Sequence, residues 1–542
     1  MSAMTASPVV AEEEPPFDAW KAWTISTVVI LGILMSMLDS TVVNVTLPTI
    51  MSVFNVAMSG VQWISTAYTL SMAIVIPLGP YMSRVFGPER VYMAALAIFT
   101  ASSFLCGFSW SLNTLIVFRI IQAIGGGVMM PIGMGMVMTL FPPSKRGLAF
   151  GVFGVAMTAA PAFGPTLGGY VVDALGWRYV FYINVPIGIV AFFLGTMFFQ
   201  FIKRNPFPRF DIVGFLSAGI GSSLLLYLLG QNTSIDWTDP KYIYMTILGV
   251  GGIVFFLINE LLIDEPLLDL RLLKNRNYSV SMILSIIQTL MMMSIAYTTP
   301  IFLQDFKGMS AMESGEVLLP SSLVMALFMP IAGRITDMAG PRMTKWVIAI
   351  GITICGASTF WMSSLMHIDA SITDIIIASS IRNIGLGISM MPVQTMGLFS
   401  IPVKDSQRAT ALQTFIRQYS SSITVALVTF SVTSRFDSNY ANAAAQLTPF
   451  NQPLNNLIAQ LSPMLTAGGV PAGSSSQEVL SLVVGQLYEQ NYVLAIQYTI
   501  FTFAIVGMFA LVMVPFFKIA HKPKPGAVPN PSAEPQGAVA GA

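Results

Sequence analysis

The chain has 542 residues, of which 54% are hydrophobic and only 9% are charged, and its formal net charge is +1. Ordinary soluble domains carry roughly 25% charged residues, so this composition excludes a soluble protein and predicts an all-α protein that crosses a membrane many times. The near-neutral charge also excludes a basic surface for nucleic acid, and we expect no nucleic-acid partner.

Fourteen apolar runs are each long enough to cross a bilayer as a helix, which takes about 20 mainly apolar residues. They lie at residues 22–47, 61–83, 91–110, 113–140, 148–172, 179–202, 212–231, 242–262, 278–303, 314–335, 345–366, 372–400, 408–433 and 489–517. With the N-terminus inside, most Lys and Arg residues fall in inner loops, and the outer exceptions are Arg178, Lys241, Lys307 and Arg435. Basic loops face the cytoplasm, so we expect both termini there.

The first span contains a carboxylate, Asp39, within an apolar stretch. An ionised acid in hydrocarbon costs several kcal/mol or more, so such a group is neutralised, is paired, or faces a water-filled path. Asp39 is therefore a candidate proton carrier. The alternative is a helix-capping or interfacial acid near the membrane edge.

An internal repeat divides the chain. Arg119 and Arg382 lie 263 residues apart, and each is followed by a Gly-rich run that ends in Met-Met-Pro. At about 30 to 33 residues per helix and loop, this offset equals eight helices, so two six-helix halves are separated by two inserted helices. The predicted regions are a cytoplasmic tail at 1–21, a first half at 22–202, an insert at 203–277, a second half at 278–517 with a long external loop at 434–488, and a cytoplasmic tail at 518–542. Six-helix repeats around a central cavity are a transporter architecture.

No motif for metal or cofactor chemistry is present. The two histidines, His367 and His521, form no HExxH motif, and the sequence has no Gly-Lys pair for a phosphate-binding loop. The two cysteines, Cys106 and Cys355, lack metal-ligand spacing. We expect no catalytic residue, no metal and no cofactor, and we expect that the protein is not an enzyme.

Several motifs make the chain resemble the fourteen-helix drug:proton antiporters of the major facilitator superfamily, the EmrB/QacA-type multidrug exporters. The motifs are LDSTVVNVTLP at 38–48, FRIIQAIGGG at 118–127, APAFGPTLGG at 160–169, WRYVFYINVPIG at 177–188, FDIVGF at 210–215 and EPLLDLRLLKNRNY at 265–278. The resemblance implies the major facilitator fold with 14 transmembrane helices, a bacterial inner-membrane location, and a proton gradient as the energy source.

The resemblance also implies gating motifs. Their residues are Gly164, Pro165, Gly168 and Gly169 in the fifth span, and Gly333, Asp337, Gly340 and Arg342 after the tenth. The corresponding loop of the first half, residues 79–90, departs from the family because Arg84 stands where an acid is expected. Latching by that loop is therefore better supported in the second half. The small residues of the fifth span also fit ordinary close packing of helices.

Arg119 is the predicted proton-coupling partner of Asp39. A guanidinium keeps its charge, so it must find an acid, carbonyl groups or water inside the bundle. A purely structural role that anchors its helix explains the same residue. Arg382 and Arg417 also lie within spans, and Arg417 is equally explained by a side chain that reaches the inner surface.

Polar side chains within the spans are candidates for a substrate cavity. They are Tyr68, Gln122, Gln288, Tyr297, Gln394, Gln413 and Tyr419. Flexible methionines, 35 in total, suit a cavity that accepts several apolar shapes, or they simply pack. The stretch 434–488 is either a docking surface for a periplasmic adaptor, which would link to an outer-membrane channel, or a plain linker.

The sequence therefore predicts a proton-coupled antiporter that exports hydrophobic or amphipathic compounds by alternating access. Its predicted partners are small amphipathic substrates, protons and the lipid bilayer. A transporter of the same fold dedicated to one lipid-like or metabolite substrate is one alternative. A non-transporting membrane sensor or scaffold is the alternative of another class, and such a protein is expected to carry an appended cytoplasmic domain.

Overall fold

The computed structural model describes residues 18–518 except 57, 62, 143, 200–209, 231–234, 237, 264–265, 403–404, 446, 449–450, 469–470 and 472–473. The predicted cytoplasmic tails, 1–21 and 518–542, lie outside the described residues apart from 18–21 and 518. All helices below are therefore those of the described ranges.

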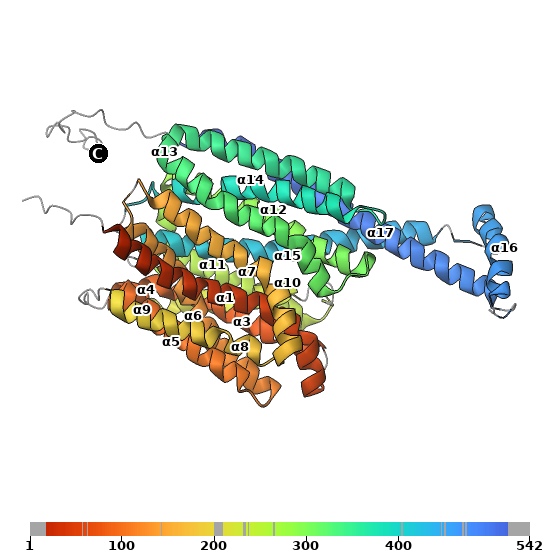
Figure 1. The fold of residues 1–542 in the computed structure, drawn as a ribbon, viewed down its shortest axis with the longest axis horizontal. Helices are drawn as coiled ribbons and strands as arrows, with labels where there is room; N and C mark the ends of the chain where they lie inside the picture. The colour runs from red at the N-terminus through yellow and green to blue at the C-terminus, as the bar shows by residue number, and fades with distance from the viewer. Residues whose placement is uncertain are drawn as a thin grey trace, which may run out of the picture.

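Long helices lie side by side along one direction and form two groups with a pair between them (Figure 1). The first half comprises α1 (Ala19–Phe54), α2 (Met58–Val61), α3 (Trp63–Val75), α4 (Leu78–Phe86), α5 (Pro88–Gly107), α6 (Leu112–Leu140), α7 (Arg146–Leu175), α8 (Tyr179–Tyr182) and α9 (Asn184–Phe198). The inserted pair is α10 (Ile212–Gly230) and α11 (Pro240–Leu262). The second half comprises η1 (Leu270–Lys274), α12 (Arg276–Ile301), η2 (Phe302–Phe306), α13 (Ala311–Leu365), α14 (Ile372–Leu398), α15 (Ser406–Ala444), α16 (Gln452–Ala467), α17 (Ser475–Met508), α18 (Ala510–Met513) and η4 (Val514–Phe516).

Local sequence signals set several helix ends and bends. Gly340 has φ +72°, a backbone conformation that favours glycine, and it divides α13 into two spans, Met312–Met338 and Arg342–Leu365. Ser310 and Glu313 form a capping box at the start of α13, so Glu313 is a helix-terminus acid. α3 and α4 meet at a bend of 53°.

The number of membrane-crossing helices is only partly settled by length and composition. Among the described residues, ten segments are long and apolar enough to cross, or eleven when the bent pair α3 and α4 counts as one. The described part of every predicted span is largely helical, with the tenth and eleventh spans both in α13. However, α10 and the described apolar part of α7 are short, and α15 is rich in polar residues. The count of fourteen therefore stays a prediction.

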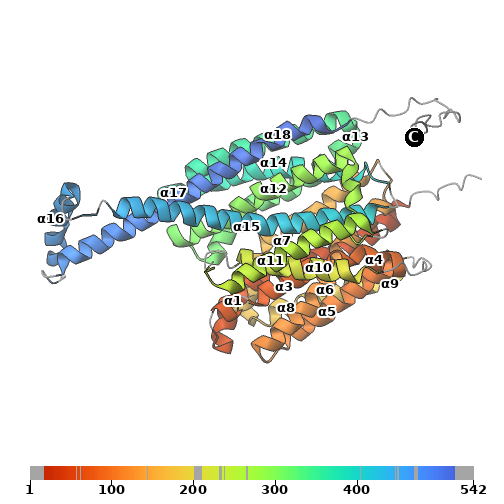
Figure 2. The same cartoon turned by 180° about the vertical axis from the view of Figure 1, so that it is seen from behind.

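α7 is the main bridge between the halves. It packs on α1 of its own half and, even more extensively, on α13 of the other half. A second bridge joins α6 to α15, where the hydroxyl of Thr410 donates to the carbonyl of Pro131 at 3.1 Å. The inserted helix α10 lies against α3 and α15, as Figure 2 shows from behind.

The stretch predicted as a long external loop, residues 434–488, is largely helical. α15 continues to Ala444, α16 covers Gln452–Ala467, and α17 already begins at Ser475. α16 lies beyond the bundle, on the end opposite to the start of α1 (Figure 1). The polarity of this stretch suggested a loop, but its many Ala, Gln and Leu residues favour helix.

Candidate functional site

Asp39 lies at the centre of a buried polar cluster in the first half. Its side chain, on α1, is 1% exposed, and its Oδ2 forms an ion pair with Nη1 of Arg119 on α6. Its Oδ1 accepts hydrogen bonds from Nε2 of Gln122 at 3.0 Å and from Nδ2 of Asn184 at 2.9 Å. The carboxylate is thus ion-paired and accepts from three donors, as a buried charge requires. The structure therefore brings Asp39 and Arg119 into direct contact, and their proposed role in proton coupling stays a prediction.

A second ring of contacts holds these partners in place. The hydroxyl of Ser103, on α5, accepts from Gln122 and from Asn184, both at 3.1 Å, and donates to the carbonyl of Phe181 at 2.9 Å. Oε1 of Gln122 accepts from Arg119 at 2.7 Å. Five helices therefore contribute to the cluster: α1 carries the carboxylate, α6 and α9 contact it directly, and α5 and α8 contribute through Ser103 and Phe181.

Arg119 is also covered by aromatic rings. Its guanidinium carbon lies 4.0 Å from the ring centroid of Tyr68, whose hydroxyl is 3.2 Å from that of Ser36. The Gly-rich run of α6 makes room for this arrangement, because a Cβ on Gly126 would lie 2.7 Å from the Ser36 hydroxyl. A Cβ on Gly125 would lie 2.5 Å from the carbonyl oxygen of Ala95. These glycines let three helices pack around the ion pair.

The arginine at the repeat position of the second half has different partners. Nη1 of Arg382 donates to Oδ1 of Asn383 at 3.0 Å, and Nη2 donates to the carbonyls of Met291 and Met292, both at 3.3 Å. No carboxylate of a described residue pairs with it. Its charge is therefore met by fixed dipoles that cannot be titrated.

The two halves touch most closely where α7 begins. Oδ1 and Oδ2 of Asp337 accept from the backbone N–H groups of Gly147 and Leu148, both at 2.8 Å, so a second-half acid caps a first-half helix. A Cβ on Gly333 would lie 2.0 Å from the carbonyl oxygen of Gly147. The backbones are in direct contact here, which closes this end of the bundle between α7 and α13.

The remaining residues of the gating motifs occupy varied places. A Cβ on Gly164 would lie 2.1 Å from Oγ1 of Thr41, and one on Gly168 would lie 3.0 Å from Val42, so both glycines sit against α1. Gly169 has open space around it. Gly340 forms the turn within α13, and Arg342 is exposed. The side chain of Pro165 lies outside the described ones.

The predicted cavity residues fall into three groups. Tyr68 and Gln122 belong to the cluster around Asp39. Gln288 and Gln394 line a small cavity near Arg417, and Gln413 and Tyr419 are on the same helix as Arg417.

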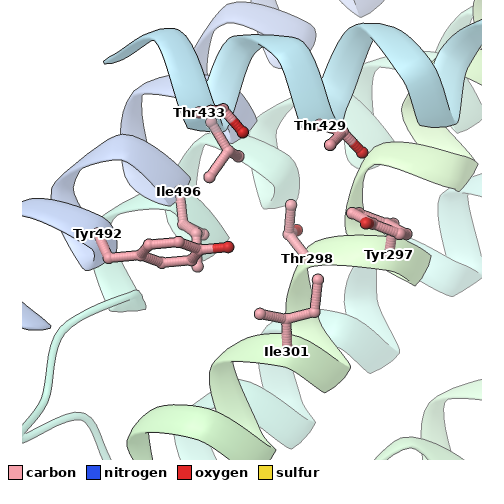
Figure 3. A pocket seen from close by; sticks show the side chains of 8 residues that line it. Tyr297, Thr298, Ile301, Thr429, Thr433, Tyr492 and Ile496 are labelled. Atoms are coloured by element: carbon pink, nitrogen blue, oxygen red, sulfur yellow. The ribbon is translucent and has the colours of Figure 1, made fainter. Parts of the chain in front are cut away.

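Tyr297 lines a separate cavity of about 30 Å³, toward the end of the bundle that carries α16. Figure 3 shows this cavity between α12, α15 and α17, with threonine and tyrosine side chains around it. A water molecule needs about 10–15 Å³ of such volume, so the space holds only a few waters. Drug-sized ligands occupy roughly 300–1,000 Å³, so this cavity within the second half is too small for one.

Sequence reasoning missed two ligands of the central cluster. Asn184 lies within the motif at 177–188, so the resemblance could have pointed to it. Ser103 carries no signal, because a serine in an apolar helix commonly bonds its own backbone. Within the described residues, no group of three or more His, Cys, Asp or Glu side chains could hold a metal ion.

An all-helical bundle built from two halves, with a buried ion pair between its helices, has the architecture of a secondary transporter. The sequence pattern of the Major Facilitator Superfamily matches residues 29–425. The chain belongs to this superfamily, and it is therefore a membrane transporter rather than an enzyme. The predicted family resemblance and all-α major facilitator fold are confirmed.

Relatives and solved structures agree with this assignment. The chain is 33% identical over 443 residues to the uncharacterized MFS-type transporter YhcA of Bacillus subtilis, covering 80% of this chain and 82% of that protein. It is 26% identical over 513 residues to the multidrug export protein EmrB of Haemophilus influenzae, covering 94% and 98%. It is 28% identical over 410 residues to the lincomycin resistance protein LmrB of Bacillus subtilis, covering 75% and 85%.

Two solved structures show the same fold. The proton:xylose symporter XylE matches with a TM-score of 0.57 at 14% identity, over 92% of this chain and 95% of that one. The human organic anion transporter MFSD10 matches with a TM-score of 0.57 at 13% identity, over 92% and 100%. At these identities the likeness concerns the fold alone.

Proposed function

We propose that the protein is a proton-coupled antiporter that exports amphipathic compounds by alternating access. The observation that carries this proposal is the buried carboxylate of Asp39 in contact with Arg119. A carboxylic acid can carry a proton, whereas an arginine cannot release one under physiological conditions. An acid buried inside a membrane bundle is a functional residue by default.

Protonation of Asp39 supplies the coupling. It removes the charge that balances Arg119, and a buried guanidinium without its partner destabilises the surrounding packing by about 3–5 kcal/mol. A two-state equilibrium shifts from 1:99 to 99:1 with about 5.5 kcal/mol, so proton binding at this pair contributes much of the bias between two conformations. Deprotonation restores the ion pair and the conformation described above.

α7 is the element that moves between the two arrangements. Its first turn is capped by Asp337 of the second half, and its later glycines lie against α1 of its own half. Opening the bundle at the start of α7 breaks the two hydrogen bonds to Asp337 and the close backbone packing on α13, and leaves the α1 contacts in place. The small residues along α7 form what we call the α7 seam. We propose that its start, at Gly147, opens and closes against α13, and that its later part, at Gly164 and Gly168, stays packed on α1.

The substrate class and the energy source rest on further support. EmrB is named as a multidrug export protein and LmrB as a lincomycin resistance protein, which supports export of amphipathic compounds. The proposed energy source is the proton gradient, with no cofactor. The basic loops support a bacterial inner-membrane orientation with both termini in the cytoplasm.

An adaptor partner is proposed for the helical extension formed by the end of α15, α16 and the start of α17. It stands outside the bundle on the end opposite to the start of α1, which is the outer side in this orientation (Figure 2). A protruding surface of this kind is accessible to a periplasmic adaptor that leads to an outer-membrane channel.

The proposal is tested with purified protein in liposomes under an imposed pH gradient. The measurement is efflux of a panel of cationic, neutral and anionic amphipathic dyes. We expect the wild type to move at least one of them, and Asp39→Asn to lose gradient-driven efflux because the amide cannot titrate. Asp374→Asn, which changes an exposed acid at the start of α14, is the control. Gradient-driven efflux at the normal rate by a folded Asp39→Asn protein would refute the proposal.

A further inference from the structure

Arg417 is a cation at the centre of the boundary between the two halves. It lies on α15 of the second half, and its guanidinium reaches two helices of the first half. Nη2 is 3.5 Å from the sulfur of Met130 on α6, and Nη1 is 4.0 Å from the sulfur of Met157 on α7. Thioether sulfur is a weak acceptor, so these contacts do little to balance the charge.

The two other arginines within spans each have oxygen partners at their terminal nitrogens, and their buried Nε atoms are without one among the described residues. Arg119 has the carboxylate of Asp39, and Arg382 has two carbonyls and an amide oxygen. Among the described residues, no carboxylate or carbonyl oxygen accepts a hydrogen bond from Arg417. A partly buried charge without an oxygen partner is costly, and an anionic ligand would reduce that cost.

Buried polar atoms without partners lie beside this cation. Gln413, one helical turn before Arg417, is 4% exposed, and neither its amide nitrogen nor its amide oxygen has a hydrogen-bond partner. Gln394, 2% exposed, has an unpartnered Oε1, and the Ser285 hydroxyl is also unpartnered. Native proteins satisfy nearly all buried polar atoms, so a cluster of exceptions marks a place where a ligand supplies the missing bonds.

A cavity and an apolar wall complete the site. Arg417, Gln394 and Ser285 line one cavity of about 10 Å³, the size of a single water molecule, together with Gln288, Thr289, Met292 and Met390. With Met130 and Met157 opposite, flexible thioethers surround the cation from both halves. Methionine side chains adapt to apolar shapes, so separation of the halves would leave a charged centre with a deformable apolar lining.

We propose that the exported compounds include amphipathic anions, and that Arg417 binds their carboxylate, sulfonate or phosphate group while the methionines contact the apolar body. Gln413 and Gln394 supply the accompanying hydrogen bonds. Arginine suits this task because its planar fork binds two oxygens at once. This inference names the substrate class of the proposed exporter and rests on that function.

The test is binding of radiolabelled laurate to the intact protein in nanodiscs of neutral phosphatidylcholine, without any pH gradient. Competitors share the same alkyl tail and differ in the head group: dodecyl phosphate, dodecanol and dodecyltrimethylammonium. We expect dodecyl phosphate to displace laurate, and the alcohol and the ammonium compound to displace it at least about tenfold less well, because charge-assisted hydrogen bonds contribute roughly 1.5–3 kcal/mol.

Variants then locate the head group. Arg417→Gln should weaken laurate binding at least about tenfold, and Arg417→Lys should weaken it less because the charge is kept. Arg435→Gln, which removes an exposed arginine of the same helix, should bind laurate like the wild type. Unchanged binding by Arg417→Gln, or equal displacement by all three competitors, would overturn the inference. Should Arg417→Gln fail to fold, the competitor order in the wild type and the Arg417→Lys affinity decide the matter.

Failure here is distinguishable from failure of the proposed exporter. Asp39→Asn should still bind laurate, since that carboxylate contacts Arg119 rather than Arg417. Proton-driven efflux of cationic dyes without any laurate binding would overturn the anion site alone. Laurate binding without gradient-driven efflux of any compound would support the anion site and count against proton coupling.

Discussion

The two halves stabilise a buried arginine charge in different ways. Each buries an arginine at the repeat position, but Arg119 faces the carboxylate of Asp39, whereas Arg382 faces the carbonyls of Met291 and Met292 and the amide of Asn383. A carboxylate can be switched off by a proton, and a carbonyl dipole cannot. In the first half the partner of the buried arginine can be neutralised by a proton. In the second half the partners are uncharged oxygens, for which this is not possible.

The corresponding loops of the two halves differ in the opposite sense, because the acid is in the second half. The second half keeps Asp337, which caps α7 across the boundary, while the first half has Arg84 where the acid is expected. The contact between the halves at this end is thus made by an acid of the second half, and a latching role for it stays a prediction. The comparison teaches that the two repeats differ in where their acids lie, with an ion-paired carboxylate inside the first half and a helix-capping carboxylate of the second half at the boundary.

The largest expected loss of stability and transport comes from removing one partner of the Asp39–Arg119 ion pair. Arg119→Met leaves a fully buried carboxylate without its charge partner, so we expect a loss of about 3–5 kcal/mol in stability and loss of transport. Arg382→Met removes no ion pair and should destabilise less. Thermal unfolding in detergent, measured in parallel for both variants, checks the order.

The double variant Asp39→Leu with Arg119→Met sharpens this result. Removing both charges should recover most of the stability lost in Arg119→Met, because a buried ion pair is often replaced by apolar side chains at little cost. Transport should stay absent, since no titratable group remains. Equal stability of Arg119→Met and Arg382→Met would contradict the distinction between the halves.

Substitution in the α7 seam should have the next largest effect. A leucine at Gly164 overlaps Thr41 of α1 and should cost about 1–3 kcal/mol through overpacking, together with most of the transport rate. Gly169→Leu is the matched control, because a Cβ at that position meets nothing within 4 Å. Dye efflux normalised to folded protein compares the two, and equal rates would mean that the seam does not govern the cycle.

The latch should give a smaller effect. Asp337→Asn retains one acceptor for the α7 N-terminus and loses the negative charge, so we expect a loss of about 1 kcal/mol in stability and a several-fold change in efflux rate. Asp374→Asn serves again as the exposed control. An Asp337→Asn protein with wild-type stability and rate would show that the cap carries no latching function.

The smallest effect on the purified protein is expected in the extension. Replacing residues 451–476 with a short Gly/Ser linker removes α16 from the end of the bundle and leaves the clusters around Asp39 and Arg417 intact. Efflux in liposomes should be unchanged, whereas resistance in cells that need an adaptor should be lost. Unchanged resistance in cells would show that α16 is not the docking surface.

Sequence reasoning located the charges but not their surroundings. Asp39, Arg119 and Arg382 stand out because a charged residue is rare in an apolar run. The positions of Asn184 and Ser103 could not be derived, because Asn184 reaches Asp39, and Ser103 reaches Gln122 and Asn184, only through tertiary packing. Tyr68 and Gln122 were predicted to line a substrate cavity, and the structure places them around the ion pair instead.

The sequence likewise predicted the helices of the fold but not all of their extent or their contacts. The described part of each predicted span is largely helical, because long apolar runs of this kind are typical of membrane helices. The helical state of residues 434–488 was missed, since polarity alone cannot separate a loop from an exposed helix. The contact of α7 with α13 also required the structure, because a small-residue stripe does not name its partner.

The most direct test of the central claim is the infrared C=O stretch of protonated carboxylic acids in the lipid-reconstituted protein, followed as the pH is lowered. We expect a band from a buried acid to grow in the wild type and in Asp337→Asn, and to be missing in Asp39→Asn. A titrating buried band that persists in Asp39→Asn would contradict proton binding at Asp39, and so would a wild type in which no such band develops.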